Sequence, residues 1–150
     1  MTTDEDFMRL ALQLAAKAGE AGEVPVGAVV VREGQVIGRG TNAREASHDP
    51  TGHAEIGAIR EASRSLGSWR LDGSSLYVTL EPCPMCAGAL VMARIERLVF
   101  AAADAKAGSC GSLYNLCADP RLNHEVTVTR GILSDEAGTM LAQWFAAKRT

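Results

Sequence analysis

The spacing of hydrophobic residues along the chain predicts an opening helix followed by a β-hairpin. From Phe7 to Ala18, apolar residues recur every three or four positions, and Gly19 follows where such a helix could end. Residues 27–31 and 35–38 are rich in β-branched residues and flank a short Gly-containing turn, so we expect a hairpin. The polar segment 43–52 contains a proline and is expected to be a loop.

Residues 53–66 are expected to form a second helix. One side of this helix would carry Ile56, Ile59, Ser63 and Leu66. Residues 75–80 alternate as in a strand, and Pro84 suits the first turn of a following helix. That helix, over residues 86–93, lacks polar side chains and is expected to be covered on all sides.

The last third of the chain predicts two further strands, 98–101 and 126–129, and a final helix after Ser134. Residues 102–119 are Gly-rich and irregular, with one short helical turn near Tyr114. The final helix is expected to bury Ala137, Met140, Leu141, Trp144 and Phe145. These elements predict a three-layer α/β/α fold with a mixed sheet of about five strands. We expect residues 1–150 to form a single domain.

Composition narrows the functional classes. The chain has 150 residues, 47% hydrophobic and 22% charged, as in ordinary globular proteins. No apolar run approaches the ~18 residues of a membrane span, and the acidic start is unlike a signal peptide, so we expect a cytoplasmic protein without a membrane partner. The net charge of −3 argues against bulk adhesion to nucleic acid. In a reducing compartment, the four cysteines of the chain are expected to be free thiols or metal ligands.

Two short motifs carry the candidate chemistry: His53-Ala54-Glu55 and Pro82-Cys83-Pro84-Met85-Cys86. Imidazole and thiolate are preferred zinc ligands, and a catalytic zinc has three protein ligands and an open position for water. His53, Cys83 and Cys86 would hold one zinc ion. Glu55 is interpreted as the proton carrier, because a fourth protein ligand would close the site.

Spacing also predicts where this metal would lie. Cys83 and Cys86 are three residues apart, so their sulfurs face the same way in a first helical turn. His53 and Glu55 are about 200° apart around a helix, so the ion must lie beyond that helix's N-terminal end. Two helix N-termini would then meet beyond the carboxyl edge of the strand 75–80.

Other interpretations of these residues remain open. The Cys83-x-x-Cys86 pair alone would also fit a thioredoxin-like redox site. A four-cysteine structural zinc using Cys110 and Cys117 is disfavoured by their spacing, and we expect both to be buried thiols. His48 is expected in a loop near a substrate entrance and His124 in a hydrogen-bonding position.

The two motifs and their flanks resemble the bacterial tRNA-specific adenosine deaminases, within the zinc-dependent cytidine deaminase superfamily. The similarity extends over nearly the whole chain. The similar segments are residues 24–28, 49–56, 81–89, 104–108, 111–113, 122–124 and 131–136.

This resemblance implies a cytidine deaminase-like fold, a homodimer, and conversion of the wobble adenosine of a tRNA anticodon stem-loop to inosine by a zinc-activated water, with Glu55 as the proton shuttle. Asn42 would hydrogen-bond the purine, while Val26 and Ala54 would line the base pocket. The resemblance assigns RNA contacts to Asp104, Lys106, Phe145, Lys148 and Arg149.

Some features depart from an RNA-binding enzyme. The chain is acidic, has no lysine-rich tail and is only 5% aromatic, so recognition should depend on a splayed loop and a close-fitting base pocket. The motif alone would also fit a small-molecule nucleobase deaminase such as guanine deaminase. A zinc protein that only binds tRNA is the alternative from a different class.

Overall fold

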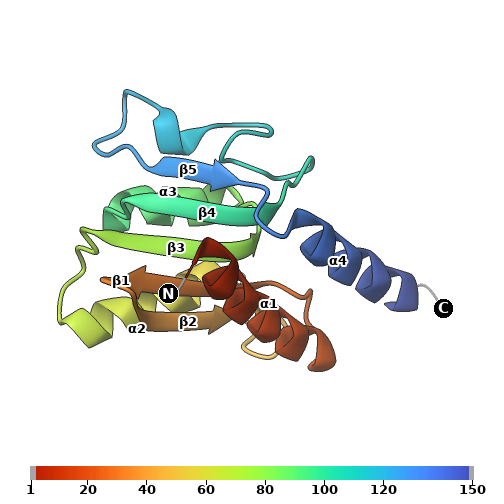
Figure 1. Ribbon diagram of the computed structural model, residues 1–150. Coiled ribbons are helices and arrows are strands. Elements are labelled where there is room, and N and C mark those ends of the chain that lie inside the picture. Colours follow the sequence, from red (N-terminus) through yellow and green to blue (C-terminus); the bar gives the residue numbers. More distant parts are fainter. Residues whose placement is uncertain (1–2, 149–150) are drawn as a thin grey trace.

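Five β-strands form one mixed sheet in the computed structural model, which describes residues 3–148 (Figure 1). The strands are β1 (Gly27–Arg32), β2 (Gln35–Thr41), β3 (Ser74–Leu80), β4 (Arg97–Ala102) and β5 (Thr127–Arg130). Their order in the sheet is β2-β1-β3-β4-β5. The strand β1 is antiparallel to both neighbours, whereas β3, β4 and β5 are parallel. The predicted hairpin is present, and β3, the helix that follows it and β4 form a parallel βαβ unit.

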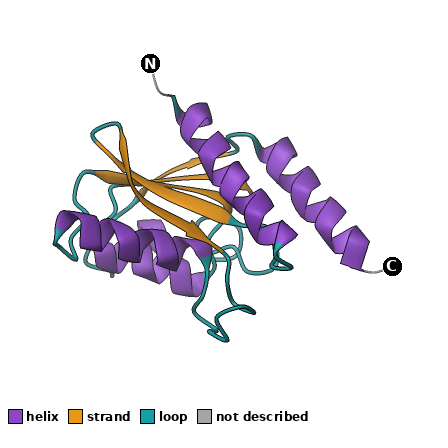
Figure 2. Cartoon of the chain, turned by 90° about the horizontal axis from the view of Figure 1, so that it is seen from below, coloured by secondary structure: helices purple, strands orange, loops and turns teal. Residues whose placement is uncertain are grey.

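Helices cover both faces of this sheet (Figure 2). One face carries α1 (Asp4–Glu20) and α4 (Ser134–Lys148), and the other carries α2 (Ala54–Leu66) and α3 (Pro84–Ala93). Alternate strand residues enter the two cores: Val78 and Phe100 face α2 and α3, whereas Tyr77 and Val99 face α1. A short 3-10 helix, η1 (Leu116–Ala118), lies beside α3. The predicted three-layer fold is therefore confirmed.

The helix α2 packs against β2 through small residues, whereas the side that carries its bulky residues is only partly buried. Ile56, Ile59, Ser63 and Leu66 are only half-buried. The buried positions are Ala54, Glu55, Ala58 and Ala62. The reason lies in β2, where a Cβ added at Gly38 or Gly40 would collide with the α2 backbone. Glycine facing alanine thus lets the strand and helix backbones approach closely and fixes the start of α2.

Two burial predictions were wrong in part. The helix α3 is not covered on all sides, because Met92 is 68% exposed. In α4 only Ala137 is fully buried, and Phe145 is 43% exposed. The physical reason is that α4 begins against β4 and then extends past the edge of the sheet (Figure 1). Its far end is held by Trp144, whose Nε1 donates to the Gly19 carbonyl at 3.3 Å.

A partly buried ion-pair cluster fixes the start of α1. The Arg97 guanidinium donates to both carboxylate oxygens of Asp4, at 2.9 and 2.7 Å. The Tyr77 hydroxyl donates to the same carboxylate at 2.6 Å. These contacts tie α1 to β3 and β4 at the end of the sheet away from the candidate site. Among the described helices, none has the length and hydrophobicity needed to cross a membrane.

Candidate metal centre

A cavity of about 160 Å³ lies at the carboxyl end of β3, where α2 and α3 begin. His53 is the N-cap of α2 and Cys83 is the N-cap of α3, so both helices start at this cavity. Pro84 occupies the first turn of α3, where its missing N–H costs no helical hydrogen bond. The cavity is lined by Val24, Val26, Asn42, Arg44, His53, Ala54, Glu55, Leu80, Glu81 and Cys83.

His53, Cys83 and Cys86 converge at one side of this cavity. The His53 Nδ1 lies 3.5 Å from the Cys83 Sγ and 3.5 Å from the Cys86 Sγ. In residues 3–148 these three form the one group of such side chains whose ligand atoms all lie within 4.8 Å of one another. One imidazole nitrogen and two sulfurs match the donors of a catalytic zinc with three protein ligands. The residues present therefore fit a zinc ion.

The surroundings of the Cys83 sulfur favour a negative charge. Neither His53 nor Cys83 makes a side-chain capping hydrogen bond in the described structure, so helix N–H groups remain available beside the site. A hydrogen bond from Cys86, together with His53, lowers the pKa of the Cys83 thiol to about 4. The same hydrogen bond raises the pKa of Cys86, and the bond with Cys83 raises the pKa of His53. The cysteine pair is thus part of a three-donor group with His53, unlike an isolated redox pair.

Glu55 lies in the first turn of α2 and lines the same cavity. It is 4% exposed, and burial raises the pKa of its carboxyl to about 7. A carboxyl in this range can both accept and release a proton near neutral pH. The arrangement thus places three potential metal donors beside a cavity that is lined by a buried carboxyl with a pKa near neutrality.

The residues expected to bind the base lie in the lining of this cavity. Val26 and Ala54 supply apolar walls, and both are buried. Asn42 also lines it, but its side chain is already engaged: Nδ2 donates to the Val24 carbonyl at 3.2 Å, and Oδ1 accepts from the Arg44 amide at 3.3 Å. The Asn42 amide retains one further donor and one further acceptor site.

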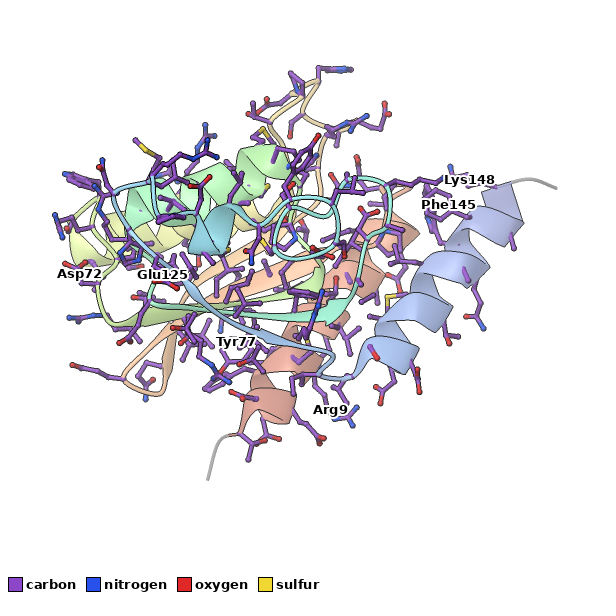
Figure 3. The ribbon with its side chains drawn as sticks, turned by 90° about the horizontal axis from the view of Figure 1, so that it is seen from above. Arg9, Asp72, Tyr77, Glu125, Phe145 and Lys148 are labelled. Atoms are coloured by element: carbon purple, nitrogen blue, oxygen red, sulfur yellow. The ribbon has the colours of Figure 1, made fainter. Side chains whose placement is uncertain are left out.

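The expected RNA contacts lie outside the cavity. Asp104 begins an irregular loop after β4, where its carboxylate accepts from the amides of Lys106 and Ala107. Lys106 is exposed in this loop. Phe145 and Lys148 lie together near the end of α4 (Figure 3). Arg149 lies outside the described residues.

A second cavity of about 460 Å³ links α4 to the candidate metal centre. It is lined by Trp144 and Lys148 of α4, and it shares Asn42 and Arg44 with the lining of the first cavity. The Lys148 Nζ lies 5.2 Å from the centre of the Trp144 ring. An aromatic face and two cations therefore lie beside the cavity that contains Glu55.

The sequence interpretation missed two buried carboxylates. Glu23 accepts from the amides of Glu45 and Ala46. Glu81 accepts hydrogen bonds from residues 104–112. Burial raises the pKa of Glu81, but these hydrogen bonds, of which that from the Ser112 side chain has the largest effect, together lower it by more. The pKa of Glu81 therefore lies below its ordinary value. The only signal for Glu81 was its place between a strand and the cysteine motif, and Glu23 had none.

The remaining cysteines and histidines lie elsewhere. Cys110 and Cys117 are buried with their sulfurs 3.5 Å apart, and neither belongs to the three-donor group. The His124 Nε2 lies 2.6 Å from the Ile95 carbonyl oxygen. His48 is exposed in the loop after β2 and has a left-handed backbone with φ 49°.

Comparisons with known proteins agree with this geometry. Residues 1–102 match the family described as cytidine and deoxycytidylate deaminase zinc-binding region. The chain is 50% identical, over 99% of its length and 92% of the relative's, to a tRNA-specific adenosine deaminase from Bacillus subtilis strain 168. Among solved structures, it resembles one from a study of A-to-I editing by tRNA:A34 deaminases at the wobble position (TM-score 0.87, 47% identity, covering 90% of this chain and 98% of that one). A guanine deaminase from Nitrosomonas europaea is also similar (TM-score 0.84, 27% identity, covering 97% and 86%).

Proposed function

Because the chain belongs to the cytidine and deoxycytidylate deaminase family and, within it, to the tRNA-specific adenosine deaminases, we propose that it converts the wobble adenosine of a tRNA anticodon to inosine. The reaction consumes one water and releases one ammonia for each adenosine. The observation that carries the proposal is the convergence of His53, Cys83 and Cys86 beside the cavity that the buried Glu55 lines, in a chain 50% identical to such an enzyme.

His53, Cys83 and Cys86 hold one zinc ion per chain in this proposal. When bound, zinc supplies Lewis-acid chemistry that makes a water nucleophilic near neutral pH. Glu55 accepts a proton from the attacking water, delivers it to the ring nitrogen N1 next to C6, and later transfers a proton to the departing ammonia. Burial of Glu55 beside the donor group supports this role.

The base enters between Val26 and Ala54, and the free positions of the Asn42 amide hydrogen-bond the purine. Asp104 and Lys106 contact the sugar-phosphate backbone from one side. Phe145 and Lys148 contact the anticodon loop from the other, and Arg149, outside the described residues, is assigned to the same RNA by the resemblance. Support for the second group comes from the cavity that joins the end of α4 to Asn42 and Arg44.

We further propose that residues 1–150 act as one domain in a cytoplasmic homodimer. The outer face of α3 supports the dimer, since the helix carries no charged side chain and Met92 is 68% exposed. Leu113 and Tyr114 are also exposed large hydrophobic residues, in the segment that precedes η1. A second copy of the chain would cover this apolar surface.

The direct test is incubation of the zinc-loaded protein with an anticodon stem-loop that carries a wobble adenosine, followed by nucleoside analysis. Multiple-turnover formation of inosine is the expected result. The same assay should include guanine and free nucleosides, because a guanine deaminase from Nitrosomonas europaea shares the fold. Turnover of guanine without inosine formation in RNA would contradict the proposal, and RNA binding without turnover would indicate a silent binding protein.

Zinc binding has its own test. Cys83→Ala and Cys86→Ala each remove one of the three donors, so each is expected to lose both bound zinc and activity. Cys110→Ala is the matched control, since Cys110 is buried but lies outside the donor group. It should retain about one zinc per chain by elemental analysis. Zinc retained by both Cys83→Ala and Cys86→Ala would contradict the assigned ligand set.

A further inference from the structure

Glu81 is a buried carboxylate directly after β3 and two residues before Cys83. It is 2% exposed. Burial of a carboxylate is costly unless hydrogen bonds replace those it would make with water. Glu81 accepts four such bonds, and their donors are three backbone amides and one hydroxyl. Its environment is therefore built from one loop, and not from a cationic partner.

All four donors belong to the loop of residues 104–112. The Asp104 amide donates to Oε1 at 3.1 Å, and the Cys110 amide donates to Oε2 at 3.0 Å. Ser112 donates twice, through its amide to Oε2 at 3.0 Å and through its hydroxyl to Oε1. The two ends of the loop thus meet at one carboxylate.

The middle of the loop also closes around this group. A Cβ added at Gly108 would lie 2.5 Å from the Glu81 carboxyl carbon. The next residue, Ser109, donates its amide to the Pro82 carbonyl at 2.9 Å. The loop therefore contacts Glu81 and Pro82, which lead directly into the Cys83 turn.

We propose that Glu81 is a positioning residue that fixes the loop 104–112 relative to the cavity, so that Asp104 and Lys106 meet the RNA backbone while the target base lies beside Glu55. This inference rests on the proposed function. Glu81 also lines the cavity, and in this proposal it acts through the loop. A carboxylate is required because both oxygens face donors, whereas a glutamine would present its own NH₂ group to two of them.

The central variant is Glu81→Gln, which preserves size and removes two acceptor positions. We expect zinc content unchanged and kcat for the stem-loop within about threefold of the unaltered protein. The KM for the stem-loop should rise by roughly tenfold or more, as for loss of hydrogen bonds to a charged group. In a Glu55→Gln background, the Kd for the same stem-loop should rise in parallel. Hydrogen exchange should accelerate at the amides of Asp104, Cys110 and Ser112.

Two further variants separate positioning from a general loss of structure. Gly108→Ala keeps the Glu81 charge, but its Cβ would collide with the Asp104 carbonyl oxygen and with the Glu81 carboxylate. It should therefore displace the loop and reproduce the KM increase. Ser112→Ala removes only the hydroxyl donor and leaves three backbone donors, so its KM should change by less than about threefold. If Glu81→Gln does not fold, the contrast between Gly108→Ala and Ser112→Ala tests the same contact.

The two proposals fail in distinguishable ways. Absence of inosine formation by the unaltered protein contradicts the proposed function, whereas the hydrogen-exchange comparison still tests whether Glu81 holds the loop. Unchanged exchange in the loop, an unchanged KM in Glu81→Gln, or a loss confined to kcat or to zinc content would overturn the positioning role.

Discussion

The helix α2 carries two glutamates, Glu55 and Glu61, that differ in burial. Glu55 is buried in the cavity, whereas Glu61 is exposed two turns later on the same helix. We expect Glu55→Gln to retain zinc but to lower kcat by about 10²-fold or more, because the amide cannot carry the proton. Glu61→Gln should be indistinguishable from the unaltered protein. Metal analysis and single-turnover deamination measure both effects, and substantial turnover by Glu55→Gln would remove Glu55 as the proton carrier.

The Asp4 cluster gives a prediction for the pH dependence of stability. Hydrogen bonding to Arg97, opposed by burial and assisted by Tyr77, lowers the pKa of Asp4. A lowered carboxyl pKa stabilises the fold above the unfolded value of about 3.9, and the gain is lost as the pH falls through the folded pKa. Asp4→Asn should lower the Tm at pH 7 by about 2–4 °C, corresponding to about 1 kcal/mol.

Thermal unfolding at several pH values measures this difference, which should shrink as the pH falls below about 4. Asp72→Asn is the matched control, because the Asp72–Arg70 pair is more than half exposed. It should change the Tm by less than about 1 °C. If the Tm difference between Asp4→Asn and the unaltered protein grew as the pH fell, the Asp4 pKa would not be lowered in the folded protein.

At the residue scale, the sequence predicted groups whose chemistry is rare and missed groups whose role depends on burial. His53, Cys83 and Cys86 could be found because imidazole and thiolates at this spacing have few other uses. Glu23 and Glu81 could not, since an isolated glutamate in a sequence is usually exposed. Their burial depends on loops 43–52 and 104–112, which wrap around them only in the folded chain.

At the element scale, the glycines of β2 determine where α2 lies. A Cβ at Gly40 would strike the backbone of Ala54 and Ala58, whereas a Cβ at Gly57 would make an ordinary 3.5 Å contact. Gly40→Ala should therefore destabilise the fold by about 1–3 kcal/mol and weaken zinc retention, because the start of α2 must move. Gly57→Ala should be neutral or stabilising by up to about 1 kcal/mol.

Denaturant unfolding and zinc competition with a chelator measure this contrast between the two glycines. If Gly40→Ala had the stability and zinc affinity of the unaltered protein, close packing would not be what fixes α2. The pair also shows why the buried side of α2 carries alanines: the glycines of β2 bring the two backbones so close that larger side chains would not fit between them.

Element boundaries were predictable where local signals agree. The strands β3 and β4 follow from β-branched and aromatic residues, and Pro84 marks the start of α3. The exposure of Met92 and Phe145 could not be read from periodicity, because it depends on how far α3 and α4 extend beyond their neighbours.

At the scale of the whole molecule, the exposed face of α3 predicts the state of association. We expect the protein to sediment as a dimer and Met92→Glu to shift it to a monomer at micromolar concentration, since a charge cannot be buried there without a partner. Gln13→Glu, on the exposed side of α1, is the control and should remain dimeric. Light scattering at several concentrations measures both. A dimeric Met92→Glu, or a monomeric unaltered protein, would contradict the interface.

The order of the strands in the sheet could not be predicted from the sequence. The strands β3 and β4 and the helix α3 between them could be predicted, but nothing local specifies that β1 lies between β2 and β3 or that β5 adds beside β4. Those pairings depend on long-range burial of Val29, Val30 and their partners on both faces. The convergence of the three donors could nevertheless be predicted, because α2 and α3 begin at two of the proposed ligands, His53 and Cys83.

These helix starts have a thermodynamic consequence. His53 and Cys83 occupy positions where a serine or an aspartate would usually close a helix, yet neither side chain bonds to its own helix in the described structure. Without that closure, the opening turns of α2 and α3 are the parts of each helix most prone to fraying. Removal of the proposed zinc by a chelator should therefore first unfold the opening turns of α2 and α3, while the two hydrophobic cores on either side of the sheet remain folded.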